Sequence, residues 1–392
     1  MEAKRKVNFY LVKIKADLLT GRMEKVLREA LTEDFGGNFT EDLGEDLSEY
    51  LDGELYRNEC GEQFSFRIIE NACAFEDAGI KGRLKNSRIL FAVELDETGV
   101  NLEASGLLRI LNSFAGKEYL SGAVGGVIVD GKGEMYTKDM GRRIVFAANM
   151  AGCTFPGKPL TEATASLNNF RVLADLWQVT REEAYVKSCR LLIDKITAYE
   201  HKKTDKPQIL AIHASNKTTS NSLKLWEMVK EELRGESAIE EISIRNGQVV
   251  DCRGCRYEEC LHFGENSGCF YGGVMVDKVY PAILKCEILM LICPNYNDAV
   301  SANIMAFINR LTAVFRANDF SKKKVYAIVV SGYSGGDIVA QQIISAVNMN
   351  KNFILPGEFA LIETANAPGE IMESEGIRER AAVFGQRISS TG

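Results

Sequence analysis

The sequence predicts two tandem α/β domains, each a doubly wound parallel sheet covered by helices. Three observations lead to this prediction. The chain has 392 residues, enough for two domains at the usual size of roughly 100–200 residues. Short apolar runs rich in β-branched residues alternate with amphipathic helical stretches in each half. Several segments of the first half also recur in the second half at a shift of about 200 residues.

The elements of the second half follow from its apolar runs, taken in chain order. The expected strands are residues 208–213, 241–244, 288–293 and 325–330. The helical patterns between and after them are residues 222–233, 276–285, 301–316 and 337–347. Continuous apolar strands separated by helices indicate a parallel sheet covered on both faces. Such a sheet binds its ligands at the carboxyl ends of the strands.

The internal repeat keeps both order and spacing, which favours duplication over chance. The repeated segments are Pro156-Gly157 with Pro356-Gly357, Thr164-Ala165 with Thr364-Ala365, the stretch from Ser87 with that from Cys286, and residues 7–14 with 207–214. A polar linker at residues 201–207 separates the copies. We therefore expect domains at residues 1–200 and 207–392.

Composition excludes several classes of function. The net charge of −7 argues against a nucleic-acid surface. No stretch reaches the roughly 18 apolar residues of a membrane span, and residues 1–15 lack the apolar region of a secretory signal. We expect a cytoplasmic protein that binds neither nucleic acid nor membranes.

Small polar side chains fill residues 214–222, between the first expected strand of the second half and its helix. Backbone N–H groups at a helix N-terminus attract anions, and the hydroxyls add donors. The same residue types are also preferred helix caps, so a plain capping loop is the alternative.

This loop resembles the first loop of the NADPH-dependent FMN reductase family and its iron–sulfur flavoprotein relatives. Their pattern is Gly-Ser-Pro-Arg, polar residues, Gly/Ser-Asn-Thr/Ser and a helix. The matching positions are Ser215, Lys217, Ser220, Asn221 and Ser222, whereas Ala214 and Asn216 replace the usual glycine and proline. The resemblance implies flavodoxin-like domains and a bound flavin mononucleotide (FMN).

Two further loops resemble the family. Residues Pro294, Asn295, Tyr296 and Asn297 precede a helix with Ser301, Phe307 and Arg310 at matching positions, although Met305 and Asn309 replace the common lysine and aspartate. The other loop contains Ser331, Gly332, Tyr333, Gly335 and Gly336. The resemblance implies that both loops contact the isoalloxazine ring, since an aromatic side chain can stack on it and glycines let the backbone approach. A strand-to-helix turn with a buried tyrosine is the alternative for the first of them.

Four cysteines crowd into eighteen residues: Cys252, Cys255, Cys260 and Cys269. Clustered cysteines in a cytoplasmic protein indicate metal ligands or redox groups. Four thiolates can hold a [4Fe–4S] cluster or one zinc ion, and free redox thiols are the third reading. The resemblance to iron–sulfur flavoproteins favours the cluster. His262 lies inside the same loop, where we expect it to be exposed and not a ligand.

The first half lacks these features. Residues 15–22 contain no run of hydroxyls, and Glu94-Leu95-Asp96-Glu97 stands in place of Pro294–Tyr296. Carboxylates there would repel a flavin, so we expect a degenerate copy without one. The acidic residues 41–54 are expected to be a solvated insertion. Because family members are often dimers, the resemblance implies a homodimer or a first half that acts as a built-in pseudo-partner.

The resulting prediction is an FMN-dependent oxidoreductase of the NAD(P)H-dependent FMN or quinone reductase type. Reduced nicotinamide is the expected donor, and a quinone, another flavin or a redox protein the acceptor, with a possible relay through an iron–sulfur cluster. No catalytic side chain is needed, because the flavin carries the chemistry. The alternatives are a non-enzymatic flavin and iron–sulfur electron carrier, and a metal or redox sensor built on the cysteine loop.

Overall fold

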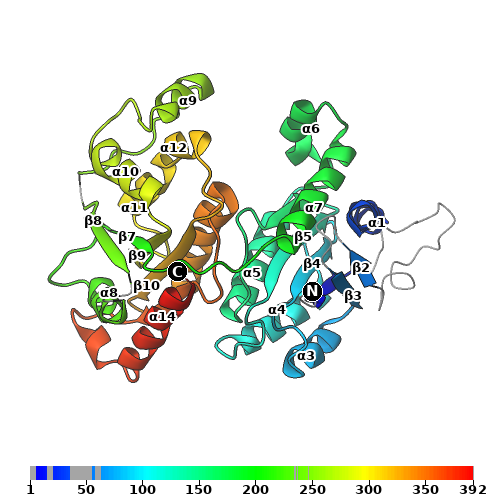
Figure 1. Ribbon diagram of the computed structural model, residues 1–392, viewed down its shortest axis with the longest axis horizontal. Helices are drawn as coiled ribbons and strands as arrows, with labels where there is room; N and C mark the ends of the chain where they lie inside the picture. Colours follow the sequence, from blue (N-terminus) through cyan, green and yellow to red (C-terminus); the bar gives the residue numbers. More distant parts are fainter. Residues whose placement is uncertain are drawn as a thin grey trace, which may run out of the picture. The chain divides into compact units, whose positions relative to one another are not determined.

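The computed structural model describes residues 6–15, 21–35, 55–57, 63–233, 235, 237–245 and 247–391. The chain divides into two compact units, residues 1–200 and 201–392 (Figure 1). Each unit contains five parallel strands in the spatial order 2-1-3-4-5, counted along that unit. This is the flavodoxin-like order, so the predicted fold class is confirmed for both halves. Residues 41–54 and Cys60 lie outside the described residues.

The sheet of the first unit runs β2-β3-β1-β4-β5-β6. Its parallel strands are β1 (Lys6–Ile14), β3 (Gln63–Ile69), β4 (Arg88–Leu95), β5 (Val124–Gly131) and β6 (Leu160–Ala163), and β2 (Leu55–Arg57) pairs antiparallel with β3. The helices of this unit are α1 (Arg22–Phe35), α3 (Ala72–Ile80), α4 (Leu102–Phe114), α5 (Thr137–Met150), α6 (Arg171–Trp177) and α7 (Arg181–Thr197). Helix α1 packs against α7, and α4 packs against α3 and α5.

The sheet of the second unit runs β11-β10-β9-β7-β8. Its strands are β7 (Gln208–His213), β8 (Ala238–Ser243), β9 (Ile288–Pro294), β10 (Lys324–Ser331) and β11 (Ala360–Thr364). The helices are α8 (Asn221–Glu232), α9 (Tyr257–Glu265), α10 (Tyr280–Lys285), α11 (Ala302–Arg310), α12 (Thr312–Ala317), α13 (Gly336–Ile343) and α14 (Ile377–Thr391). Every residue of β10 is buried, as expected of a central parallel strand covered on both faces.

Equivalent hydrogen bonds recur in both units and support the duplication. The amide of Asn149 donates to the Cys153 carbonyl at 2.9 Å, and the amide of Asn348 donates to the Phe353 carbonyl at 2.7 Å. Likewise, isolated parallel bridges join Val124 to Thr154 and Lys324 to Ile354, 200 residues apart. The repeated sequence segments therefore occupy equivalent places in the two sheets.

Three expected helices of the second half differ in detail. The helix expected at 301–316 is two helices, α11 and α12, that meet at Leu311. The one expected at 276–285 begins as a π-helical turn, Met275–Val279, and becomes α10 where Pro281 lies in the first turn and supplies no N–H donor. The one expected at 337–347 ends in a π-helical turn, Ile344–Met349.

Candidate functional site

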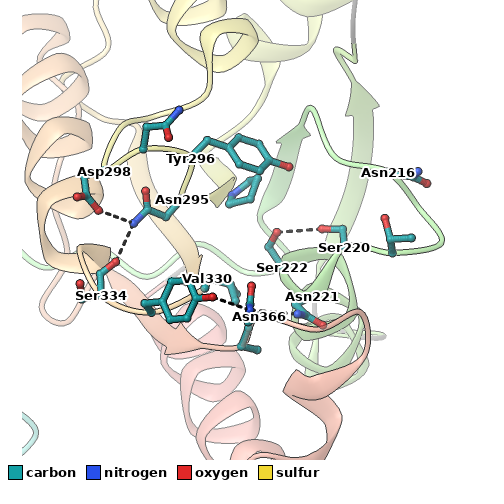
Figure 2. A pocket seen from close by; sticks show the side chains of 16 residues that line it. Asn216, Ser220, Asn221, Ser222, Asn295, Tyr296, Asp298, Val330, Ser334 and Asn366 are labelled. Atoms are coloured by element: carbon teal, nitrogen blue, oxygen red, sulfur yellow. Dashed lines mark hydrogen bonds between the residues drawn. The ribbon is translucent and has the colours of Figure 1, made fainter.

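A pocket of about 590 Å³ lies at the carboxyl edge of the second sheet. Loops after four strands line it: Asn216, Thr219, Ser220, Asn221 and Ser222 after β7, Pro294–Asp298 after β9, Val330, Gly332, Tyr333 and Ser334 around the end of β10, and Ala365 and Asn366 after β11. Figure 2 shows Ser222, Tyr296 and Asn366 facing one hollow from three of these loops. The place is the one where doubly wound sheets bind ligands.

The start of helix α8 presents unused backbone donors to this pocket. Ser220 is the N-cap, and its Oγ accepts from the Leu223 N–H at 3.2 Å. The N–H groups of Asn221 and Ser222 belong to the first turn, which has no intrahelical acceptors for them. Hydrogen bonds within the described chain give neither N–H a partner. Together with the positive end of the helix dipole, they suit an anion.

The side chain of Asn221 holds the loop that follows β11. Its Nδ2 donates to the carbonyls of Ala365, at 3.2 Å, and Ala367, at 2.9 Å, and its Oδ1 accepts from the Gly369 N–H at 2.8 Å. The amide is therefore saturated by the protein, and what Asn221 offers a ligand is its backbone N–H. The sequence motif gives no signal of this role, because the partners lie about 145 residues away.

Ser215 and His213 lie beneath the same loop. Ser215 is buried, and its Oγ has no hydrogen-bond partner in the described part of the chain. Its N–H donates to Nδ1 of the buried His213 at 3.4 Å, and Nε2 of His213 lies 3.5 Å from Glu241 Oε1. Contact with His213, followed by the Trp226 N–H and Lys230, lowers the pKa of Glu241 to about 2. This network fixes the end of β7 where the loop begins.

The loop after β9 is a tight turn that exposes a tyrosine. Tyr296 and Ala299 pair across the turn, and Asn297 and Asp298 between them both have positive φ angles of 56° and 54°. Two left-handed central residues make this a type I′ turn, for which Asn and Asp are favoured. The turn leaves 59% of Tyr296 exposed at the pocket, so the alternative of a buried tyrosine is wrong.

Asn295 joins this turn to the loop after β10. Its Nδ2 donates to the Ser334 carbonyl at 2.9 Å and lies 3.2 Å from Ser331 Oγ. Tyr333, on that second loop, is 80% exposed, and its hydroxyl accepts from Asn366 Nδ2 at 3.1 Å. Two exposed tyrosines on linked loops therefore face one pocket.

Glycines shape the start of α13. Gly335 caps the helix at φ +82°, in the left-handed region. A Cβ on Gly336 would lie 2.5 Å from Ile362 Cγ2 of β11. Gly336 thus allows the helix to start close to β11, whereas Gly335 allows the left-handed cap beside Asp298, and neither glycine lines the pocket.

Nine of the fourteen predicted cofactor residues line this pocket: Ser220, Asn221, Ser222, Pro294, Asn295, Tyr296, Asn297, Gly332 and Tyr333. The other five do not line it, although they belong to the same strand-end loops: Ser215, Lys217, Ser331, Gly335 and Gly336. Seven lining residues were not predicted, and five of them neighbour predicted positions: Asn216, Thr219, Asp298, Val330 and Ser334. Ala365 and Asn366 were missed because β11 was not expected as a strand. The repeated Thr364-Ala365 pair was the available signal, since it places these residues at the edge of the duplicated sheet.

The charge of the pocket lining is unusual for a phosphate site. Among the described residues, Asp298 is its one charged lining side chain, and no lysine or arginine lines it. Lys217, which the family motif places on the phosphate loop, is exposed and outside the lining. An anion here would be held by N–H groups and hydroxyls, without an ion pair.

A second cavity, of about 90 Å³, brings the four clustered cysteines together. Cys252 and Cys255 come from the loop before α9, Cys260 from α9 itself and Cys269 from the turn after it. The other lining side chains are those of Arg253, Phe263, Phe270, Tyr271, Asn309, Arg310, Thr312, Ala313 and Arg316. His262 is exposed and does not line this cavity.

The remaining described cysteines differ from this group. Cys153, Cys189, Cys286 and Cys293 are buried, as expected for small hydrophobic side chains, whereas Cys73 is exposed. Burial raises the pKa of the Cys286 and Cys293 thiols to about 12, so neither is a thiolate near neutral pH.

The corresponding edge of the first sheet is filled by charged side chains that pair with one another. Arg22 donates from Nε to Asp130 Oδ2 at 2.9 Å and also reaches the carbonyls of Gly131 and Ala165. The buried Lys13 lies 3.3 Å from both Glu24 and Glu70. Residues 16–20, the central part of the loop equivalent to 214–222, are outside the described residues.

Comparison with known families matches residues 207–367 to the NADPH-dependent FMN reductase family. No curated protein is similar enough to count as a match. Within the part of the chain that the structure describes, no helix is long and apolar enough to cross a membrane.

Several solved structures resemble about half of the chain. An FMN-dependent NADH-azoreductase from Bacillus anthracis, solved with FMN, is 12% identical with a TM-score of 0.32 and covers 46% of this chain and 99% of its own. An NAD(P)H:quinone oxidoreductase from Methanothermobacter marburgensis is 17% identical with a TM-score of 0.34 and covers 47% and 96%. The Trp repressor binding protein from Bacillus subtilis is 20% identical with a TM-score of 0.32 and covers 45% and 96%.

Proposed function

We propose that the second unit binds FMN in the 590 Å³ pocket and acts as an NAD(P)H-dependent flavin oxidoreductase. The observation that carries this proposal is the convergence of four strand-end loops on one pocket with a helix N-terminus on one side and two exposed tyrosines on the other. The family match of residues 207–367 supports the same chemistry.

The residues at the start of α8 fit a flavin phosphate. The free N–H groups of Asn221 and Ser222 and the hydroxyl of Ser220 face the pocket together. The buried Ser215 Oγ, which lacks a partner among the described residues, is a further donor beneath the loop. Because phosphate oxygens are strong acceptors, several such donors can replace an ion pair.

The two tyrosines fit the other end of the ligand. Tyr296 and Tyr333 expose aromatic faces large enough to stack on a planar ring. Asn295 and Asn366 hold the loops on which these tyrosines lie. These contacts keep the two loops in place before a ligand arrives, which reduces the entropic cost of binding.

Bound FMN would accept a hydride from reduced nicotinamide as two electrons and release electrons singly. The chain's own part is to bind and orient the two ring systems and to exclude water between them. We assign no side chain as a general acid or base. A quinone, a second flavin or a redox protein is the proposed acceptor.

We further propose that the four clustered cysteines hold a [4Fe–4S] cluster that relays electrons. Around a single zinc ion, with Zn–S bonds near 2.3 Å, the sulfurs would lie about 3.8 Å apart. Among the described residues, no group of three or more His, Cys, Asp or Glu side chains is placed to hold a metal ion, although all four thiols line one cavity. What favours a cluster over zinc is the resemblance of this loop to the cysteine loop of iron–sulfur flavoproteins.

Anaerobic purification followed by FMN reconstitution tests both proposals. We expect one FMN and about four iron atoms per chain, without zinc. Addition of NADH or NADPH should bleach the flavin on the time scale that a stopped-flow experiment resolves, and a quinone should restore the flavin absorbance. If only a reduced partner protein bleaches the flavin, the protein is an electron carrier and not an NAD(P)H-dependent enzyme. Failure to retain FMN would refute the proposed site.

A further inference from the structure

Arg310 is a buried arginine with no carboxylate partner among the described residues. It is 4% exposed, at the last position of α11, and it lines the cysteine cavity. One guanidinium nitrogen, Nη2, donates to the Gly272 carbonyl at 3.0 Å, and Nε is buried without a hydrogen-bond partner in the described chain. A buried charge is costly unless an opposite charge and hydrogen bonds compensate it.

The cavity itself has an uneven charge distribution. Three arginines line it, namely Arg253, Arg310 and Arg316, and no aspartate or glutamate does so among the described residues. Asn309, where the related family commonly has aspartate, also lines the cavity and donates from Nδ2 to Asp251 Oδ1 at 3.0 Å. The negative charge that would compensate Arg310 is therefore expected from the metal–thiolate group that the four cysteines would form.

The three arginines differ in their access to water. Arg310 is buried, Arg316 is half-buried with its guanidinium 4.4 Å from the Tyr257 ring centroid, and Arg253 is exposed. Water screens the charge of an exposed side chain far more than that of a buried one. The electrostatic effect of each arginine on the cavity should therefore fall from Arg310 through Arg316 to Arg253.

We infer that Arg310 is the buried counter-ion of the metal–thiolate group and that its charge raises the reduction potential of that group. The inference rests on the cluster proposed above. Four thiolates carry more negative charge than the metal centre neutralises, and reduction adds one more. A fixed positive charge next to the cavity stabilises the reduced state more than the oxidised state, and net charge and hydrogen bonding around a cluster set its potential.

The test compares Arg310→Gln, Arg316→Gln and Arg253→Gln in the full-length protein with FMN present. Iron content is measured first, and the cluster potential then comes from redox titration followed by electron paramagnetic resonance. We expect Arg310→Gln to shift the reduction equilibrium at least tenfold toward the oxidised state, which is about 59 mV for one electron. Arg316→Gln should shift it less, and Arg253→Gln, the matched control, by under about threefold.

Arg310→Lys separates charge from shape, because it keeps the positive charge and loses the planar guanidinium. If Arg310→Gln fails to hold iron, retention of iron by Arg310→Lys with a nearly unchanged potential still supports a counter-ion. Equal potentials for Arg310→Gln and Arg253→Gln, or iron loss in both Arg310 variants, would overturn this inference. The proposed cluster itself would still stand. Absence of iron from the unaltered protein would refute the proposed cluster first, and this inference with it.

Discussion

Ser220 combines two tasks in one hydroxyl at the start of α8. It caps the helix by accepting the Leu223 N–H, and it lies 3.0 Å from Ser222 Oγ at the pocket. The two tasks require different properties of the side chain. A helix cap needs a hydrogen-bond acceptor, whereas a residue that binds phosphate needs a hydrogen-bond donor without negative charge. Substitutions at this position can therefore separate the two.

We predict that Ser220→Ala and Ser220→Asp diverge. Ser220→Ala removes the cap and should lower the free energy of unfolding by about 1 kcal/mol while it weakens FMN binding. Ser220→Asp keeps a good cap, so stability without FMN should be unchanged, but its carboxylate would repel the phosphate and weaken FMN binding at least tenfold. Denaturant unfolding of the FMN-free protein and flavin-fluorescence titration measure the two effects. Equal FMN affinity for Ser220→Asp and the unaltered protein would place the phosphate elsewhere.

Among the elements, those with strong local signals were predicted well. The apolar run at 208–213 is the strand β7. Strand β9 extends one residue beyond its predicted bounds at one end, and β10 extends one residue beyond them at each end. The edge strands carried weaker signals. β8 lies at Ala238–Ser243, earlier than the predicted 241–244, because its half-exposed, Glu-containing sequence has little apolar pattern. β11 was missed because it is five residues long with a polar end.

The candidate site shows the same division. Loop positions adjacent to predicted strands could be placed, since parallel strands end at one edge of the sheet. Two sets of contacts could not be predicted: the hydrogen bonds of Asn221 to residues 365–369, and the hydrogen bond of Asn295 to Ser334. Each joins loops that are far apart in sequence. The spacing of the cysteines indicated that they share a site. It could not indicate the arginines around that site, because Arg310 and Arg316 come from helices about 40 to 60 residues away.

Helix α9 is held against α12 by a close backbone approach at Gly264. A Cβ there would lie 2.2 Å from the Ala313 carbonyl oxygen, and Cys260 lies one turn earlier on α9. Because Gly264 has no side chain, α9 can pack closely against α12, and this packing positions Cys260 at the cavity.

We predict that Gly264→Ala pushes α9 away from α12, costs about 1–3 kcal/mol of stability and lowers the iron content. The matched control is Gly106→Ala in α4, where the new Cβ would meet only Ala72 Cβ at 3.5 Å. That change should stabilise the protein by up to about 1 kcal/mol through helix propensity, without affecting iron. Chemical denaturation and iron analysis of both variants give the comparison. Full iron content in Gly264→Ala would show that the cysteine site does not depend on this packing.

At the scale of the whole molecule, the two sheets share one strand order but differ at the carboxyl edge of their strands. The second sheet ends in loops with free N–H groups and exposed tyrosines, whereas the first ends in a network in which Arg22 pairs with the buried Asp130. Because removing one partner of a buried pair leaves the other charge uncompensated, Arg22 stabilises the first unit at the place where a ligand would otherwise bind.

We predict that calorimetry of the full chain shows two unfolding transitions and that FMN raises only one of them. At a hundredfold excess over Kd, FMN should add about 2.7 kcal/mol to the free energy of unfolding of the unit that binds it. Since 1 kcal/mol shifts the Tm of a unit of this size by roughly 2–4 °C, its Tm should rise by about 5–10 °C. Arg22→Met identifies the other transition, since the unpaired Asp130 should lower the Tm of the first unit by several degrees and leave the FMN-dependent one unchanged. A rise of both transitions with FMN would mean that the first unit binds flavin too or unfolds together with the second. If the first unit binds flavin, the paired charges at its sheet edge do not exclude a ligand.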